Sequence, residues 1–113
     1  MHEMSIAQSI IDIVDDTLEE NEKDKLREIV VDIGELVAVV PDSLQFCYEA
    51  IVNGTRYEKA ELKIKIKPLK IKCNSCKLES KIKKYSFLCP NCDSTNISVL
   101  SGEELNIRYL EVE

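Results

Sequence analysis

The sequence contains no tryptophan, and its 113 residues include only three glycines, three prolines and one histidine. Aromatic residues make up 5% of the chain while hydrophobic residues make up 44%, so its core must be built mainly from aliphatic side chains. No apolar run approaches the roughly 20 residues of a membrane-spanning helix. The length suits one ordinary domain or two very small ones, and a unit below about 40 residues would need a staple such as a metal ion.

The chain also lacks the residue combinations that many enzymes use. Its one histidine, His2, is the second residue, so no Ser–His pair is evident, and there is no glycine-rich phosphate loop. We therefore expect no enzymatic activity. The N-terminus has neither the basic start nor the apolar core of a secretory signal, so we expect a cytoplasmic protein with no membrane partner.

The charge is negative overall but unevenly distributed. The net charge is −6. Residues 1–62 contain 15 acidic and 5 basic residues, whereas residues 63–84 contain nine lysines and a single acidic residue, Glu79. The basic segment favours an anionic partner, while the charge of the whole chain disfavours sequence-independent binding to nucleic acid.

Apolar residues recur at helical spacing in two segments. Ser5 and Gln8 form an S-x-x-Q capping box, and the periodicity behind them predicts a helix over residues 5–20. A second capping pattern begins at Asp42 and predicts another helix, which Gly54 ends.

Other segments have the composition of strands. Residues 26–36, after a polar turn at 21–25, are β-branched and apolar on both parities, as in a central strand covered on both faces. Residues 61–72 alternate, but Pro68 reverses the phase of the alternation, which turns the side chains to the opposite face. We therefore expect a boundary between two units there. Alternation over residues 105–109 predicts a last strand.

Together these elements predict an α+β fold in two parts. The first part, residues 1–69 and 97–113, is a small two-helix domain with a mainly antiparallel three-stranded sheet. The second part, residues 70–96, is an inserted module that resembles a zinc ribbon and holds four of the five cysteines.

The four cysteines form two C-x-x-C pairs, Cys73 with Cys76 and Cys89 with Cys92. One tight turn presents two thiolates to a single ion, and two such turns complete a tetrahedron, which zinc prefers and iron also accepts. Four thiolates leave no open coordination position, so the site is expected to be structural. Disulfides or free thiols are the alternatives, and a reducing compartment disfavours cross-linking.

Some features of the module leave other interpretations open. Its C-P-N-C turn resembles that of rubredoxin, which binds iron, although Lys77 and Asp93 stand where such turns usually have glycine. A zinc ribbon that binds nucleic acid is the alternative function, and a solvated face is the simpler reading of the basic segment. The side chains in question are Lys70, Lys72, Lys77, Lys81, Lys83, Lys84, Tyr85 and Phe87. The fifth cysteine, Cys47, is expected to be a small core residue of the second helix.

The amino end offers a second kind of metal site. The α-amine of Met1, the main-chain nitrogen of His2 and the His2 imidazole can chelate one ion in fused small rings, and Glu3 is a candidate fourth donor. Nitrogen-rich, nearly planar donor sets suit Ni(II) or Cu(II). A helix that begins nearby disfavours a cation by about 0.3–1 kcal/mol. An exposed histidine without a ligand is the alternative.

Three stretches together resemble one known family. They are M-H-E-M-S-I-A-Q-S-I-I at the start, I-G-E-L and V-P-D-S-L-Q-F-C-Y-E within residues 33–49, and the C-x-x-C and C-P-x-C turns. Over essentially the whole chain this pattern is similar to the HypA/HybF nickel metallochaperones of nickel–iron hydrogenase maturation.

The resemblance implies that the first domain binds Ni(II) through His2 and delivers it to the hydrogenase active site, with Glu3 and the Met1 amine as further candidate ligands. It implies structural zinc on Cys73, Cys76, Cys89 and Cys92. The expected partners are a nickel-handling maturation GTPase and the hydrogenase large-subunit precursor, and the chain itself is expected to be a monomer or a homodimer. Some relatives recruit a second histidine, which this chain lacks.

Overall fold

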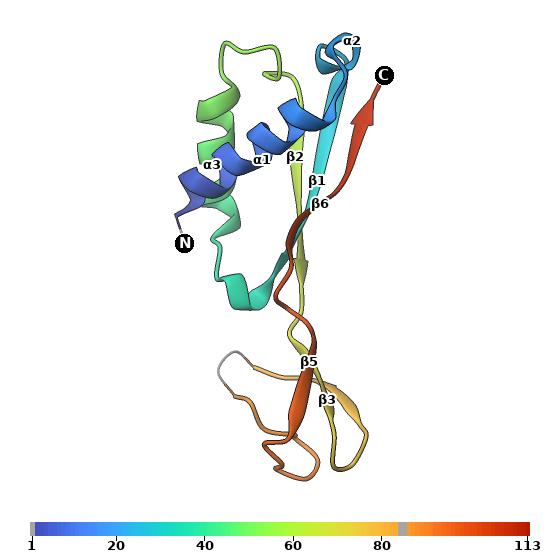
Figure 1. The fold of residues 1–113 in the computed structure, drawn as a ribbon. Coiled ribbons are helices and arrows are strands. Elements are labelled where there is room, and N and C mark those ends of the chain that lie inside the picture. The colour runs from blue at the N-terminus through green and yellow to red at the C-terminus, as the bar shows by residue number, and fades with distance from the viewer. Residues whose placement is uncertain (1, 84–85) are drawn as a thin grey trace. The chain divides into compact units, whose positions relative to one another are not determined.

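A computed structural model describes residues 2–83 and 86–113 (Figure 1). It divides into two compact units. The first comprises Met1–Asp32, Val39–Lys65 and Asn106–Glu113, and the second comprises Ile33–Ala38 and Ile66–Leu105. The helices are α1 (Glu3–Thr17), α2 (Glu20–Lys23), α3 (Pro41–Val52) and the 3₁₀ turn η1 (Glu35–Val37). The strands are β1 (Leu26–Gly34), β2 (Glu61–Lys67), β3 (Lys70–Cys73), β4 (Glu79–Lys81), β5 (Ile97–Ser101) and β6 (Leu105–Val112).

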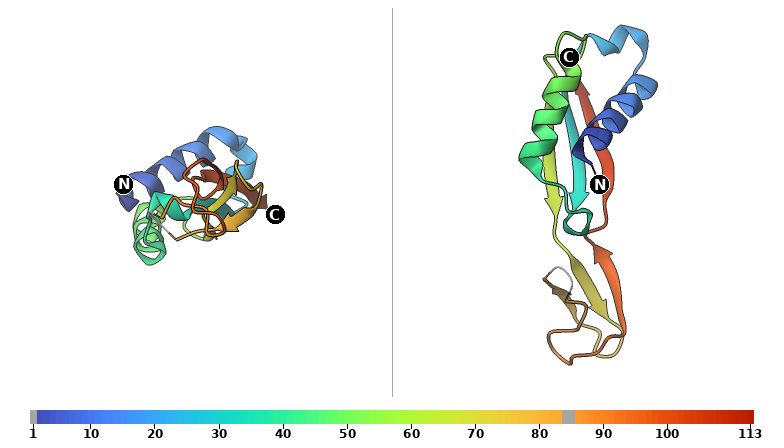
Figure 2. Two further views of the ribbon diagram at one scale, coloured as in Figure 1. Left: turned by 90° about the horizontal axis from the view of Figure 1, so that it is seen from below. Right: turned by 90° about the vertical axis from the view of Figure 1, so that its left-hand side faces the viewer.

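The first unit is built on a three-stranded sheet with the order β2-β1-β6. The predicted central strand is confirmed, because β1 is in the middle and residues 29–34 are all buried. In Figure 2, β1 and β2 run in the same direction, joined through α3, and β6 runs in the opposite direction. The α+β class of the prediction is confirmed.

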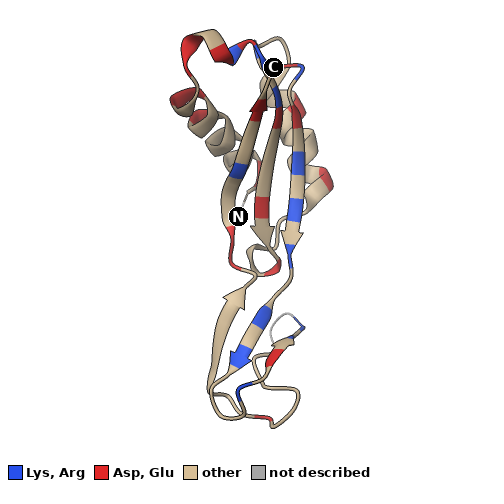
Figure 3. Ribbon diagram, turned by 90° about the vertical axis from the view of Figure 1, so that its right-hand side faces the viewer, with Lys and Arg blue, Asp and Glu red and all other residues tan. Residues whose placement is uncertain are grey.

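The two faces of this sheet differ. Helices α1 and α3 cover one face (Figures 1 and 3). Side chains of β1 alternate between the faces, and two of them, Glu28 and Asp32, pair with cations of the flanking strands. Lys63 Nζ of β2 lies 3.4 Å from Glu28 Oε1, and Arg108 Nε of β6 lies 3.2 Å from Asp32 Oδ2. The apolar pattern of β1 predicted a strand covered on both faces, and helices α1 and α3 cover one of them.

Helix α1 begins earlier and ends earlier than predicted. It runs from Glu3, so the Ser5 capping box is wrong, and the residue at the N-cap is His2. Gln8 Nε2 donates instead to Asp12 Oδ1, one turn along the helix, at 2.9 Å. Glu3 suits the first turn because its carboxylate interacts favourably with the positive end of the helix dipole. The expected apolar face is buried, through Ile6, Ala7, Ile10 and Val14.

Helix α3 starts two residues before the expected position. Pro41 is its first residue and Val40 its N-cap, so Asp42 is not the cap. Proline favours this position because its ring fixes a helical φ and the missing N–H has no partner in the first turn. Gly54 follows the C-cap with a φ of +77°, which confirms that it ends the helix. Tyr48 anchors the buried face, where its hydroxyl donates to the Ala60 carbonyl at 2.7 Å.

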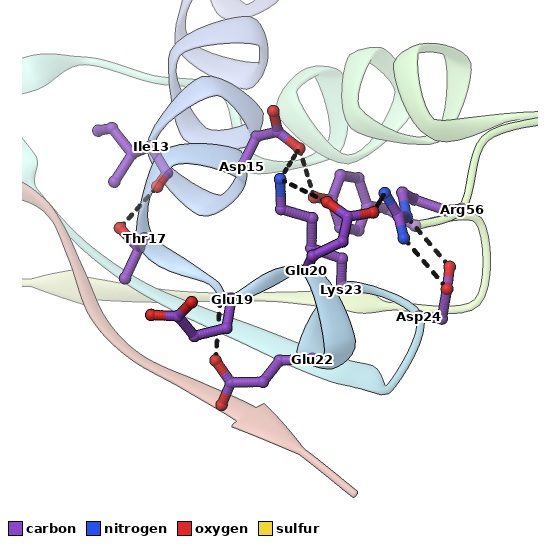
Figure 4. A network of polar contacts seen from close by, with 10 residues as sticks. Ile13, Asp15, Thr17, Glu19, Glu20, Glu22, Lys23, Asp24 and Arg56 are labelled. Atoms are coloured by element: carbon purple, nitrogen blue, oxygen red, sulfur yellow. Dashed lines mark hydrogen bonds and ion pairs between the residues drawn. The ribbon is translucent and has the colours of Figure 1, made fainter.

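A polar network ties the end of α1 to α2 and to the loop after α3 (Figure 4). The short helix α2 overlaps the polar turn predicted at residues 21–25. Arg56 Nη1 lies 2.7 Å from Glu20 Oε1, and its Nε and Nη2 donate to the two carboxylate oxygens of Asp24 at 3.1 Å. Tyr57 donates from its hydroxyl to Asp15 Oδ1 at 2.6 Å. The network therefore fastens the neighbouring helices α1 and α2 to a loop that lies 32 to 42 positions further along the sequence.

The second unit is a three-stranded antiparallel sheet with the order β4-β3-β5. Strand β2 ends before Pro68 and β3 begins after it, while the second unit starts at Ile66 and extends to Leu105. Leu69 and Ile71 are fully buried. Strands β4 and β5 were not predicted, because both are short and neither has a clear apolar alternation.

Contacts around Gly102, which has a φ of +114°, join the two segments of the second unit, Ile33–Ala38 and Ile66–Leu105. Leu36 of η1 donates its N–H to the Gly102 carbonyl at 2.9 Å. Glu35 accepts a hydrogen bond on its carboxylate from the Leu69 N–H at 3.1 Å.

Among the described residues, no helix has both the length and the apolar character to cross a membrane.

Candidate metal sites

The structure brings the four predicted cysteines together in the second unit. Their Sγ atoms all lie within 4.8 Å of one another, and the two closest pairs, Cys73 with Cys92 and Cys76 with Cys89, are 3.5 and 3.6 Å apart. These separations are far longer than the roughly 2.05 Å of a disulfide. They match the edge of a tetrahedron of sulfurs about 2.3 Å from a central zinc ion, which is roughly 3.8 Å.

The two C-x-x-C turns are built in the same way. In the first, Lys77 donates its N–H to the Cys73 carbonyl at 2.9 Å, and in the second Asp93 donates to the Cys89 carbonyl at 2.8 Å. Both donors adopt a left-handed conformation, with φ of +67° for Lys77 and +59° for Asp93. These are the two positions where the sequence pattern favoured glycine, which adopts this conformation without strain.

The first cysteine of each turn is locked in place by its own main chain. Cys73 N–H donates to the Leu78 carbonyl at 2.9 Å, and Cys89 N–H donates to the Ser94 carbonyl at 3.0 Å. Cys73 and Cys89 are fully buried, Cys76 is partly buried and Cys92 is exposed. The positions of all four thiols are therefore set by short local turns, which explains why their spacing alone was enough to predict the cluster.

Main-chain hydrogen bonds lower the pKa of two of the four thiols, whereas neighbouring thiols raise the pKa of a third. The N–H of Cys76, 3.4 Å from the Cys73 sulfur, lowers the pKa of Cys73 to about 6. A hydrogen bond from the main chain of Leu78 lowers the pKa of Cys76. The pKa of Cys92 is raised to about 12: a main-chain hydrogen bond from Ser94 lowers it, but the neighbouring thiols, Cys73 first, and burial outweigh that effect.

The short distances between the four sulfurs indicate that the cluster needs a positive charge at its centre. Four sulfurs this close cannot all be thiolates without a compensating charge, because like charges at such distances disfavour ionisation. A divalent cation at the centre supplies that charge and favours the deprotonated form of each ligand. The donor set, the distances and the closed tetrahedral arrangement all fit a structural ion of the zinc type.

The other predicted site lies at the start of α1. His2 is the N-cap residue and is exposed, and its side chain makes no capping hydrogen bond. Its carbonyl accepts the N–H of Ile6 at 3.2 Å, so the main chain is held in the helix while the imidazole extends beyond it. Met1, whose amine is a candidate ligand, lies outside the described residues.

Glu3 connects this site to the start of α3. Its carboxylate oxygen Oε2 accepts a long hydrogen bond of 3.4 Å from the Val40 N–H. In the described part of the chain, the cysteine cluster is the only group of three or more histidine, cysteine or acidic side chains close enough to hold a metal ion. Side chains alone therefore do not complete a metal site at the amino end. Cys47 is half-buried in α3 and belongs to neither site, so the expectation that it is a core residue is wrong.

Comparison with known proteins covers the whole chain. Residues 1–112 match the profile of the family described as "Hydrogenase/urease nickel incorporation, metallochaperone, hypA". The chain belongs to the HypA family. The hydrogenase maturation factor HypA of Aquifex aeolicus is 40% identical over 113 residues, which cover 100% of this chain and 98% of that protein. The factor of the same name from Geobacter sulfurreducens is 38% identical, with full coverage of both chains.

Two solved structures of HypA proteins share the fold. The solution structure of the nickel metallochaperone HypA from Helicobacter pylori has a TM-score of 0.66 and 25% identity, covering 99% of this chain and 97% of that one. A second HypA solution structure has a TM-score of 0.70 at 25% identity, covering 100% and 97%. The family resemblance drawn from the sequence is thus confirmed, and the HypA family is one of metallochaperones and not of catalysts.

Proposed function

We propose that this chain binds Ni(II) at its amino end and delivers it to the active site of nickel–iron hydrogenase during maturation. The observation that carries the proposal is the environment of His2 in a member of the HypA family. The only imidazole of the chain is exposed at the N-cap of α1 and is not used in capping. It is available to a metal ion from solvent and to a partner that takes the ion away.

The donor set proposed for nickel is the His2 imidazole, adjacent main-chain nitrogens, the Met1 amine and Glu3. Nitrogen donors in a nearly planar arrangement suit Ni(II), and the same set suits Cu(II) at least as well. Helix α1 begins directly after His2, so its dipole opposes a cation there. The charge of Glu3 and ionised main-chain nitrogens offset that effect. An open chelate at a helix end exchanges its ligands readily, which a carrier requires.

Structural zinc is proposed for Cys73, Cys76, Cys89 and Cys92. The ion would hold together a sheet whose strands have three to five residues each, too short to be stable alone. In this proposal the second unit is a rigid platform for docking, and the metal remains in place while nickel passes through the first unit. Zinc is favoured over the iron of a rubredoxin-like site because the family is named for nickel incorporation and not for electron transfer.

The partners proposed are a nickel-handling maturation GTPase and the hydrogenase large-subunit precursor. Both follow from hydrogenase maturation, the process for which the relatives are named. We propose a cytoplasmic location, where cysteines remain reduced and available to zinc. A zinc ribbon that binds nucleic acid is not favoured by any of these relatives.

Isothermal titration of Ni(II) into the zinc-loaded protein tests the proposal. His2→Ala should abolish nickel binding while zinc content and fold are unchanged. Gln8→Ala, at an exposed position of the same helix whose side chain donates to Asp12, is the matched control and should bind nickel normally. Nickel affinity that survives in His2→Ala would refute the N-terminal site.

A further inference from the structure

Strand β3 presents its lysines on one face of the second unit's sheet. Ile71 and Cys73 are buried, whereas Lys70 and Lys72, which alternate with them, are exposed, as strand alternation requires. The register places Lys81 of β4 directly opposite Lys70. Three lysines thus share one small surface, which we call the lysine face (Lys70, Lys72 and Lys81), and the register places one acidic residue, Glu79, opposite Lys72. Figure 3 shows basic positions in blue along β3.

The lysine face is unfavourable for the isolated protein. Like charges directly opposite one another on neighbouring strands are destabilising, and lysine is among the residues that strands disfavour. In the first unit, several cations pair with acids, namely Lys23, Arg27, Arg56, Lys63 and Arg108. Among the described residues, no ion pair joins a lysine of this face to a carboxylate, although Glu79 is the register partner of Lys72.

We propose that the lysine face is a docking site for an extended, acidic segment of a partner protein. Alternate residues of a strand lie about 6.4–6.8 Å apart, and an extended peptide has the same repeat. Acidic side chains at every second position of a peptide therefore match Lys70 and Lys72, while Lys81 broadens the positive surface. The carboxylates supply the charge compensation that the free protein lacks.

Three observations favour a polypeptide over a nucleic acid. Strand β3 has only four residues, a length that suits a short segment better than a long polyanion. The described strands of this sheet carry no aromatic side chain on which a base could stack. Strand β5, which flanks β3, exposes Leu100 to 47% next to the bulge in its pairing, and this side chain offers an apolar contact to a peptide.

This docking site goes beyond nickel binding and does not depend on it. The lysine face and the His2 site belong to different units. A peptide can be titrated into nickel-free protein, so failure of the docking site would leave the His2 proposal standing. Loss of nickel binding in His2→Ala would equally leave the docking site untouched.

The test is a titration of ¹⁵N-labelled, zinc-loaded full-length protein with a ten-residue peptide of alternating glutamate and threonine, followed by amide chemical shifts. The shifts should concentrate at residues 70–72, 79–81 and 98–101. The triple variant Lys70→Gln, Lys72→Gln and Lys81→Gln should raise Kd by about tenfold or more at low salt. The matched control, Lys25→Gln, Lys59→Gln and Lys65→Gln, makes the same change in net charge at exposed positions of the first unit and should leave Kd unchanged.

Several outcomes would overturn the proposal. One is an equal Kd in the triple variant and the control. Another is a shift pattern centred outside the three segments, or equal binding of a peptide with glutamine in place of glutamate. A single-stranded RNA decamer that binds more tightly than the peptide through the same residues would assign the face to nucleic acid instead. Because the substituted lysines are exposed, an unchanged amide spectrum of each free variant confirms that folding is preserved.

Discussion

Gly34 lies directly against the main chain of Gly102. A Cβ atom at residue 34 would be 1.9 Å from the Gly102 carbonyl oxygen and 2.5 Å from the nitrogen of Glu103. The same Gly102 carbonyl accepts the N–H of Leu36, and Gly34 itself donates to the Glu104 carbonyl at 2.8 Å. Main chain packed against main chain cannot move aside as a flexible side chain can.

Gly34→Ala should therefore strongly destabilise the second unit. Forcing a methyl group into a filled site typically costs about 1–3 kcal/mol, and we expect the upper end because the neighbours are main-chain atoms. Gly54→Ala is the control: its φ of +77° strains alanine, but nothing lies within 4 Å, so the cost should be about 1 kcal/mol. Urea denaturation of both variants compares them, and an equal loss would contradict the close contact.

Arg56→Gln should reduce stability more at neutral pH than in acid. Hydrogen bonds from Arg56 lower the pKa of Glu20 and of Asp24 below their ordinary values. A carboxyl whose native pKa is depressed contributes stability above its unfolded value, about 3.9–4.3, and loses it as pH falls through the native value. The difference between wild type and variant should therefore shrink between pH 7 and pH 2.5.

Urea denaturation across that pH range measures the effect, which salt should weaken because the pairs are exposed. Arg27→Gln is the matched control, since Arg27 Nη1 lies 3.8 Å from Glu113 Oε1 and makes a looser pair. A difference between wild type and Arg56→Gln that stays constant with pH would contradict this account of the network in Figure 4.

Lys81→Thr should stabilise the free protein. The substitution removes the repulsion between Lys81 and its register partner Lys70 and places a β-branched residue in a strand, with an expected gain of about 0.2–1 kcal/mol. Lys59→Thr, an exposed position of the first unit outside the strands, should be neutral. Thermal unfolding in low salt compares the two variants. Destabilisation by Lys81→Thr would mean that the lysine supports the fold and would remove one reason for assigning it to a partner.

Cys89→Ser should release the metal and loosen the second unit selectively. Cys89 is fully buried, and a hydroxyl is a poor substitute for a thiolate ligand. Hydrogen exchange should accelerate in β3 and β5, while β1 and α1 keep their protection. Cys47→Ser, outside the cluster, should retain stoichiometric zinc. Equal zinc content in both variants, measured by elemental analysis, would contradict the four-cysteine site.

Sequence periodicity predicted the elements that bury an apolar face and missed those that do not. Helices α1 and α3, the central strand β1 and the break at Pro68 all carry a clear pattern of apolar residues. Strands β4 and β5 carry no such pattern. They form because they pair with β3 in the sheet, and their own side chains do not signal a strand. Helix starts were misplaced because Glu3 and Pro41 favour a first helical turn that capping patterns at Ser5 and Asp42 do not reveal.

The two candidate metal sites also differ in how far the sequence predicts them. The cysteine cluster was predictable because each C-x-x-C turn is local and the pairs come from one short module. The contact from Glu3 to the Val40 N–H joins residues 37 positions apart, and no spacing in the sequence signals it. The lysine face was visible as a basic segment, but the opposition of Lys70 and Lys81 appears only in the sheet register.

Extending the chain before Met1 should weaken nickel binding if the α-amine is a ligand. A Gly-Ser dipeptide added there converts the amine to an amide, which is a poorer donor, while the His2 imidazole is unchanged. The expected result is a large loss of Ni(II) affinity by calorimetry, with zinc content and the unfolding midpoint as in wild type. The same dipeptide added after Glu113, which donates its N–H to the Lys25 carbonyl at 3.0 Å, is the control for tag effects. Unchanged nickel affinity in the extended protein would remove the amine from the donor set and leave the imidazole to act with Glu3, main-chain nitrogens and a partner.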